Sequence, residues 1–185
     1  MAIAYVFLAD GFEEIEALAP VDLLRRAGVN VFTVAASIDS LHVTGAHGIK
    51  VEADLPLDPS AMTEADLLVC PGGMPGAANL AANNVIGELL RRQHEAGRLV
   101  AAICAAPAVT LAPLGILDGK QATCYPGFEA QLQAGGATHK AERVVRDGNV
   151  ITSNGPSSAI PFGLALVEAL CGADTAAQVA AGILL

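Results

Sequence analysis

The sequence predicts a single α/β domain in which helices cover both faces of a mostly parallel sheet. Short apolar runs alternate with longer segments of helical spacing along the chain, which is typical of strand–helix–strand crossovers. The runs at residues 3–8, 66–70 and 99–103 are almost wholly apolar, as expected for parallel strands buried on both faces. Because no linker, repeat or low-complexity tract divides the chain, residues 1–185 are predicted to form one domain.

In the N-terminal half, a strand is predicted at residues 3–8, followed by a turn. Residues 13–27 have helical spacing, and Pro20 within them predicts a kink or a break. A second strand follows at residues 29–35. Residues 41–51 indicate two short strands around a glycine-containing turn, a candidate β-hairpin.

The C-terminal half continues the alternation and ends in helices. We expect strands at 66–70 and 99–103, helices at 85–96, 105–114, 161–170 and 175–183, and a second hairpin at 144–151.

Composition and charge narrow the possible functions. With 53% hydrophobic but only 4% aromatic residues, the core must consist mainly of Ala, Val, Leu and Ile. The formal net charge of −9 disfavours binding to nucleic-acid phosphates. No apolar run is long enough to span a membrane, and the N-terminus lacks the basic region of a signal peptide, so we expect a cytoplasmic protein without membrane or nucleic-acid partners.

Four cysteines, Cys70, Cys104, Cys124 and Cys171, lie too far apart for a C-x-x-C motif or a zinc cluster. We expect free thiols, with Cys70, Cys124 and Cys171 in structural roles. No metal or cofactor site is predicted.

Sites in open α/β sheets lie beyond the carboxyl ends of strands, which directs attention to residues 9–16, 71–76 and 104–107. Cys104 lies where an apolar strand runs directly into a predicted helix, the placement of a nucleophile elbow. A helix N-terminus favours the thiolate form. The alternative is a buried core cysteine, and spacing alone does not decide between them.

The other two strand ends carry groups that could assist a thiol. The backbone N–H groups of Gly73 and Ala105 could stabilise an oxyanion, although the glycine-rich stretch is equally compatible with an ordinary loop. Glu16 could hold a proton beside the sulfur or act as an acid or base. Its alternative is a first-turn acid that complements the helix dipole, the favoured interpretation for Glu13 and Glu14.

Six short segments form a specific combination that covers nearly the whole chain: residues 11–16, 20–22, 25–28, 69–73, 101–107 and 152–156. Together they resemble the ThiJ/PfpI superfamily, in the branch of the parkinsonism-associated deglycase (Parkinson disease protein 7) and its bacterial relative YajL. The resemblance implies a flavodoxin-like three-layer sandwich with a nucleophile elbow.

The resemblance also implies roles for the residues at the strand ends. Cys104 matches the family's nucleophilic, oxidation-sensitive cysteine, and Glu16 matches the carboxylic acid that hydrogen-bonds its sulfur. Gly73 and Ala105 match the backbone donors beside that sulfur.

Four further residues enter through the resemblance. The family is typically dimeric, and Asp22 and Arg26 match residues that reach toward the partner's site, which implies a homodimer. Tyr125 stands where animal members often carry His, and a Tyr is a poor base near neutral pH. His47 aligns with an Arg found near the pocket in some relatives and is a candidate anion contact, but a solvated hairpin histidine is the favoured alternative.

Ala105 separates this chain from related branches. The protease branch places His directly after the nucleophile, so Ala105 argues against peptidase activity. Glutamine amidotransferase domains add a downstream His and Glu that this chain lacks. His42, His94 and His139 are expected at the surface.

Two function hypotheses use these residues. The first is a glutathione-independent glyoxalase or protein deglycase, in which Cys104 attacks a reactive dicarbonyl such as methylglyoxal or glyoxal and Glu16 moves the proton. The second is a non-enzymatic stress protein, a redox sensor or chaperone that uses oxidation of Cys104.

Overall fold

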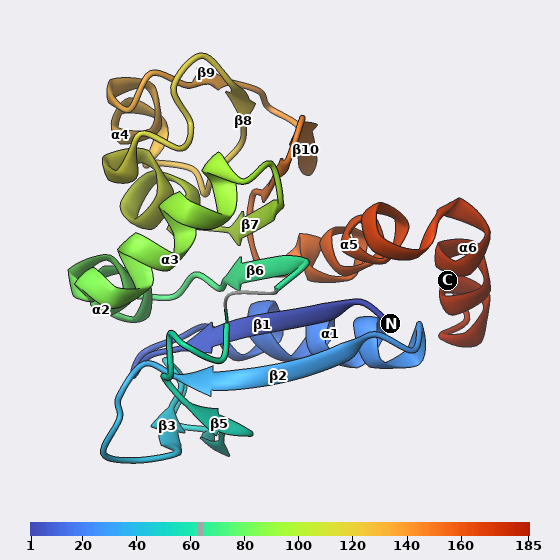
Figure 1. Ribbon diagram of the computed structural model, residues 1–185. Coiled ribbons are helices and arrows are strands. Elements are labelled where there is room, and N and C mark those ends of the chain that lie inside the picture. The colour runs from blue at the N-terminus through green and yellow to red at the C-terminus, as the bar shows by residue number, and fades with distance from the viewer. Residues whose placement is uncertain (63–64) are drawn as a thin grey trace.

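The computed structural model describes residues 1–62 and 65–185, and its seven-stranded sheet lies between two layers of helices (Figure 1). The strand order is β10-β11-β7-β6-β1-β2-β5, parallel throughout except for the edge strand β10. The predicted α/β sandwich is therefore confirmed.

The elements are β1 (Ile3–Leu8), α1 (Glu14–Arg26), β2 (Asn30–Ala35), β3 (His42–Thr44), β4 (Lys50–Glu52), β5 (Leu55–Pro56), β6 (Leu67–Cys70), α2 (Gly76–Ala82), α3 (Asn84–Glu95), β7 (Leu99–Ile103), η1 (Pro107–Leu111), η2 (Ala112–Leu114), β8 (Gln121–Ala122), α4 (Glu129–Ala134), β9 (Thr138–His139), β10 (Val144–Asp147), β11 (Val150–Ser153), η3 (Pro156–Ser158), α5 (Ala159–Cys171) and α6 (Ala173–Gly182).

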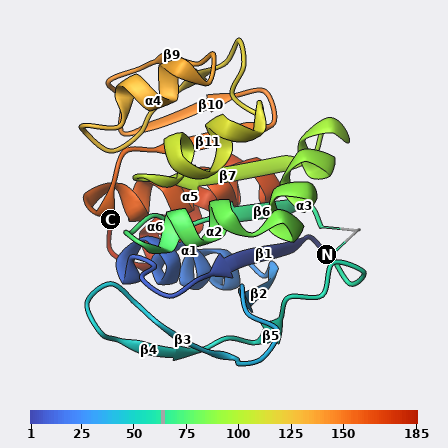
Figure 2. The same ribbon diagram turned by 90° about the vertical axis from the view of Figure 1, so that its left-hand side faces the viewer.

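The central strands are buried because helices cover both faces of the sheet. Helices α1 and α5 pack together on one face, and α2, α3 and η1 cover the other (Figure 2). Every residue of β6 is buried, as are all but the first residues of β1 and β7. The three apolar runs are thus the parallel core strands that their composition predicts. None of the described helices is both long enough and apolar enough to cross a membrane.

Helix α1 runs through Pro20 as one element, so of the kink or break predicted there, the break is wrong. Proline removes one N–H from the helix, but packing against α5 supports this turn. Gly163 of α5 makes the approach possible, because a Cβ there would lie 3.2 Å from the Cα of Pro20 and 2.6 Å from Cδ1 of Leu23. The tight contact between α1 and α5 holds α1, and with it Glu16, against the sheet.

The segment after β7 differs from the single helix expected at 105–114. It consists of the π-helical turn η1, closed by a bond from the Ala112 N–H to the Pro107 carbonyl, and the 3₁₀ turn η2. Pro113 contributes to the difference, because it cannot donate the backbone N–H that a regular α-helix would need at that position, whereas Pro107 lies in the first turn, where no such bond is made.

Both predicted hairpins are present, as the antiparallel pairs β3–β4 and β10–β11. Five short elements of the described chain were not predicted: the strands β5, β8 and β9 and the helices α2 and α4. Strands β5, β8 and β9 have two residues each, and α2 and α4 have seven and six. Elements this short carry too few apolar positions to show a period.

Candidate active site

The loops that follow β1, β6 and β7 meet at the carboxyl edge of the sheet. These three strands are neighbours in the sheet, in the order β7-β6-β1. The Glu13 N–H donates to the Gly72 carbonyl at 3.0 Å, and the Gly76 N–H donates to the Gly11 carbonyl at 3.2 Å. These bonds join the loops after β1 and β6, and the close approach of Gly72 to Cys104 adds the loop after β7 to the same site.

Cys104 forms a strained turn directly after β7. Its φ of 66° lies in the left-handed region, which costs a non-glycine residue roughly 1–2 kcal/mol. Among the described residues, only Leu184 beside the C-terminus shares a positive φ without being glycine. The Cys104 N–H donates to the Ser153 carbonyl and its own carbonyl accepts the Tyr125 N–H, both at 2.8 Å. Bonds on both sides thus hold the nucleophile elbow in place.

Glu16 is fully buried on the first turn of α1, beside this elbow. Its Oε2 accepts the Gly72 N–H at 3.0 Å, and its carboxyl shares a side-chain hydrogen bond with Cys104. Burial raises the pKa of Glu16 to about 7, with a further increase from the Glu13 charge, while the bonds to Cys104 and Gly72 oppose the rise. Oε1 of Glu16 is buried and has no hydrogen-bond partner among the described residues. The carboxyl can therefore exchange a proton near neutral pH.

The Cys104 thiol does not have the lowered pKa expected of a helix N-terminus. Burial, with the charge and hydrogen bond of Glu16, raises the pKa of Cys104 to about 12, while the Gly73 and Ala105 N–H groups oppose the rise. The expectation is wrong for the resting site because Cys104 is only 8% exposed and a short π-helical turn follows it. The thiol consequently needs a proton acceptor, and Glu16 is positioned to be one.

Gly72 is a site residue that sequence reasoning missed. A Cβ at Gly72 would lie 2.5 Å from both Cys104 Cβ and Glu16 Oε2, so only glycine fits between the two side chains. Gly73, which was singled out, has a φ of 85°, and a Cβ there would overlap the Glu13 backbone nitrogen. The Gly-Gly doublet after a buried strand was the available signal, but it did not show which glycine separates the reactive groups.

Tyr125 lies at the edge of this site. Its N–H binds Cys104 as described, and its ring lies 3.1 Å from the position that a Cβ on Gly155 would occupy. The residue is 44% exposed. The adjacent Cys124 is buried, and burial raises its pKa to about 11, with a further increase from the charge of Glu129.

His47 is largely exposed on the hairpin, as its favoured alternative predicts, and it contacts two carboxylates near the start of α1. Contact with a bound anion stays a prediction. Nδ1 of His47 lies 2.8 Å from Oε2 of Glu14 and 3.8 Å from Oε1 of Glu13. The hydrogen bond and charge of Glu14 raise the pKa of His47. Glu13 also caps α1, because its Oε2 accepts the Glu16 N–H at 2.9 Å. Glu13 and Glu14 therefore lie at the start of α1 as expected, and they also contact His47.

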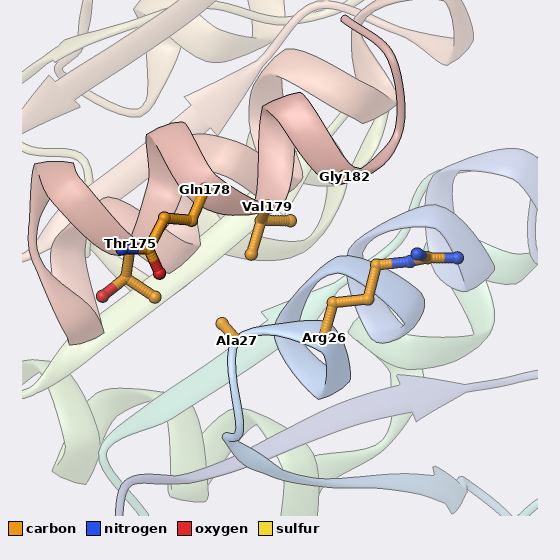
Figure 3. A pocket seen from close by; sticks show the side chains of 6 residues that line it. All are labelled: Arg26, Ala27, Thr175, Gln178, Val179 and Gly182. Carbon is orange, nitrogen blue, oxygen red and sulfur yellow. The ribbon is translucent and has the colours of Figure 1, made fainter.

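Asp22 and Arg26 pair with each other on the exposed side of α1, at 2.7 Å between Oδ2 and Nε. Arg26 is the last residue of α1, roughly 15 Å along the helix from Glu16 at 1.5 Å per residue. It lines a hollow of about 380 Å³ between α1 and α6, and Figure 3 shows its guanidinium directed away from the α6 residues. Within one chain, neither residue lies at the Cys104 site.

The remaining cysteines and histidines lie away from this edge or below the surface. Cys70 is fully buried at the end of β6, as predicted, and Cys171 is half-buried at the end of α5. His42 is exposed, whereas His94 and His139 are half-buried, so the surface expectation is correct only for His42.

Comparison with known proteins gives the family. Residues 2–169 match the DJ-1/PfpI family. The chain belongs to the DJ-1/PfpI family. It is 42% identical over 178 residues to protein DJ-1 homolog A of Arabidopsis thaliana, a match that covers 96% of this chain and 45% of the plant protein. The chain thus spans less than half the length of the plant DJ-1 homologues A and B that it matches.

Two further DJ-1/PfpI comparisons bear on the site. The chain is 38% identical over 162 residues to the glutathione-independent glyoxalase DJR-1.2 of Caenorhabditis elegans, covering 88% of this chain and 84% of that protein. Its structure is similar to that of oxidised Toxoplasma gondii DJ-1, with a TM-score of 0.92, 38% identity, and coverage of 100% of this chain and 98% of the other. The family resemblance predicted from short motifs is confirmed.

Proposed function

We propose that this protein is a cysteine-dependent enzyme of the glutathione-independent glyoxalase or protein deglycase type, and not a protease. The observation that carries the proposal is the buried Glu16 carboxyl, with a pKa of about 7, hydrogen-bonded to the elbow thiol of Cys104. A relative that carries the name of a glutathione-independent glyoxalase supports the reaction class. Ala105, where the protease branch has His, argues against peptide hydrolysis.

In the first step, Cys104 adds to the aldehyde carbon of glyoxal or methylglyoxal. The Sγ–C bond forms as the C=O π bond breaks, and the Glu16 carboxylate takes the thiol proton and passes it to the carbonyl oxygen. The N–H groups of Gly73 and Ala105, which point at the sulfur, stabilise the negative charge on that oxygen as it develops. The product of this step is a hemithioacetal.

In the second step, the hemithioacetal rearranges without an external oxidant. Glu16 moves the proton on the carbon bonded to sulfur to the neighbouring carbonyl carbon, and the hemithioacetal hydroxyl gives its proton to the neighbouring carbonyl oxygen. The first carbon is oxidised to a thioester while the second is reduced to an alcohol. Water then attacks the thioester, the S–C bond breaks, and a 2-hydroxy acid leaves with the Cys104 thiol restored.

The deglycase form of the proposal uses the same groups on an early dicarbonyl adduct of a protein side chain. Adducts that dissociate release free dicarbonyl, so both activities would then depend on one site. Comparison of rates on methylglyoxal and on a purified peptide adduct, with free dicarbonyl trapped, separates the two reactions.

The test is turnover of methylglyoxal and glyoxal by wild type and by Cys104→Ser, with Cys171→Ser as the matched control. Cys171 is a half-buried thiol at the end of α5. We expect the Cys104 variant to lose activity by about 10³-fold or more, because the hydroxyl cannot replace the thiol as nucleophile. Full turnover by Cys104→Ser, with native melting behaviour, would exclude the mechanism.

Redox sensing is a second candidate, which the oxidised state of a structurally similar DJ-1 favours. Two equivalents of peroxide would oxidise the Cys104 thiol to a sulfinic acid and release two waters, and Glu16 could hydrogen-bond the new oxygens. Intact-mass measurement after mild peroxide treatment tests this. Selective addition of two oxygens at Cys104 supports sensing, and unselective oxidation of several cysteines opposes it.

We also propose that the protein forms a homodimer through the outer face of α1. Ile15 and Leu18 are 55% and 36% exposed on this helix, beside Asp22 and Arg26. Sedimentation equilibrium of wild type and Leu18→Glu provides the test. A monomeric wild type, or a dimer that Leu18→Glu leaves unchanged, contradicts the proposal.

A further inference from the structure

A cluster of three metal-ligating side chains lies beside the Cys104 site but outside the proposed reaction. Glu13 and Glu14 come from the start of α1, and His47 comes from the loop between β3 and β4. One ligand atom of each lies within 4.8 Å of those of the other two. The cluster does not show in the sequence, because His47 is more than thirty residues from the two acids and only the fold brings them together, and no metal site was expected there.

Backbone contacts position this cluster independently of the imidazole ring. Oε1 of Glu14 accepts the His47 N–H at 2.8 Å and the Ile49 N–H at 3.4 Å. The Ala46 N–H donates to the Phe12 carbonyl at 2.8 Å, which ties the loop to the segment before α1. A Cβ at Gly45 would overlap Oε1 of Glu14, so the close approach needs glycine. The loop is therefore held with His47 next to both acids.

The two carboxylates carry negative charge in a largely buried place. Glu13 is 8% exposed and Glu14 is 4% exposed. Oε2 of Glu13 caps α1, but its Oε1 accepts no hydrogen bond within the described part of the chain, and the nearby His47 Nδ1 is 3.8 Å away. Two carboxylates held this close together with little water around their side chains repel each other. A cation between Glu13 Oε1 and Glu14 Oε2 would offset this repulsion.

We propose that Glu13, Glu14 and His47 bind one divalent transition-metal ion of the Zn²⁺ class. One imidazole nitrogen and two carboxylate oxygens match the ligands of Zn²⁺, with water in the fourth position. Nδ1 of His47 lies 2.8 and 3.8 Å from the two oxygens, close to the roughly 3.3 Å that separates ligands at tetrahedral bonds of about 2.0–2.1 Å. The nitrogen ligand disfavours Ca²⁺ and Mg²⁺, and the lack of a thiolate disfavours Cu⁺.

Binding replaces a proton with a metal ion. The Nδ1 proton, which now lies between His47 and Glu14, leaves to solvent, and the freed lone pair binds the ion. Affinity should therefore fall as the pH decreases and His47 becomes protonated. Because the Glu13 charge raises the pKa of Glu16, a bound cation would also lower that pKa. The metal site itself does not depend on the proposed function.

The test is calorimetric titration of Zn²⁺ into the full chain carrying Cys104→Ser, which removes the site thiol as a competing ligand. His47→Asn is added in one sample and His42→Asn in the control, because His42 is an exposed histidine on the same hairpin. We expect one ion per chain, a loss of affinity of about 100-fold or more with His47→Asn, and less than about a twofold change with His42→Asn. Equal Zn²⁺ affinity with and without His47, or no stoichiometric binding, overturns the proposal.

Two further measurements test whether the ion binds at Glu13, Glu14 and His47. Co²⁺ bound at this site should lack the sulfur-to-cobalt charge-transfer band, and its presence would assign the ion to a cysteine. Glu13→Gln keeps an oxygen to accept the Glu16 N–H but removes the charge, so it should weaken Zn²⁺ binding while the hairpin stays folded. If Glu13→Gln binds Zn²⁺ as tightly as the parent protein, the proposal fails even where His47→Asn disturbs the loop.

Discussion

Glu16 shares a side-chain hydrogen bond with Cys104, and Oε2 of the same carboxyl accepts the Gly72 N–H at 3.0 Å. One carboxyl thus contacts the nucleophile and holds the loop that carries the neighbouring backbone donor. The pKa is raised to about 7 for Glu16 and to about 12 for Cys104, so near pH 7 the carboxyl can ionise while the thiol stays protonated. Under the proposed function, Glu16 is the base and no histidine is needed.

Replacement of Glu16 by Gln should remove proton transfer and keep the packing. We expect kcat/KM for methylglyoxal to fall roughly 10²–10⁴-fold, the usual contribution of a general acid–base. In wild type, activity should rise with pH through about 7, because ionised Glu16 is the base. The variant should lose this dependence. Glu88→Gln is the matched control, an exposed acid on α3 paired with Arg91, and it should leave the profile unchanged. Wild-type activity in Glu16→Gln would contradict the role.

Much of the fold could be predicted from local signals. The core strands are almost wholly apolar runs, and the hairpins have glycine-containing turns, so both appear in the sequence. The segment after Cys104 could not be predicted as it is, because local spacing does not distinguish a regular helix from the π-helical and 3₁₀ turns that stand there. The tolerance of Pro20 similarly depends on a glycine on α5, more than a hundred residues away.

The sequence predicts which residues form the candidate site better than it predicts their pKa values. Cys104, Glu16, Gly73 and Ala105 do meet, because Cys104, Ala105 and Gly73 follow the ends of core strands and Glu16 lies on the first turn of the helix after β1. The raised pKa of Cys104 could not be predicted, since it depends on burial and on the distance to Glu16. The contact of His47 with the acids of α1 depends on where the hairpin folds back, which local sequence does not determine.

The stability of the protein should depend on pH through Glu16. Below its ordinary pKa of 4.5, Glu16 is neutral in both folded and unfolded chains. As the pH rises to about 7, the unfolded chain ionises Glu16 while the folded chain keeps it protonated, so stability is lost across this window. The shift corresponds to a loss on the order of 3 kcal/mol. Urea unfolding of wild type and Glu16→Gln at pH 4.5 and 7.5 measures it: the variant should gain relative stability at the higher pH. A constant difference between the two proteins would contradict the raised pKa.

Removal of the Tyr125 hydroxyl tests whether it donates a hydrogen bond to the substrate. If it does, Tyr125→Phe should lower kcat/KM by about 2- to 13-fold, which corresponds to 0.5–1.5 kcal/mol for a neutral hydrogen bond. Tyr5→Phe is the control, because the Tyr5 hydroxyl donates to the Ala61 carbonyl, in the segment that precedes β6. Equal activity of Tyr125→Phe and wild type would assign Tyr125 a packing role against Gly155.

Gly72→Ala should separate the two reactive side chains by adding a single methyl group. The new Cβ would lie 2.5 Å from Cys104 Cβ and Glu16 Oε2, and 2.9 Å from the Ile103 carbonyl oxygen. Gly72 does not have a positive φ, so the effect is steric and not conformational. We expect a loss of about 1–3 kcal/mol in unfolding free energy, typical of overpacking, together with reduced turnover. Gly182→Ala at the end of α6 is the control, since its Cβ meets nothing within 4 Å and should not destabilise the protein. If Gly72→Ala keeps both wild-type stability and wild-type turnover, Glu16 and Cys104 do not need the contact that glycine allows.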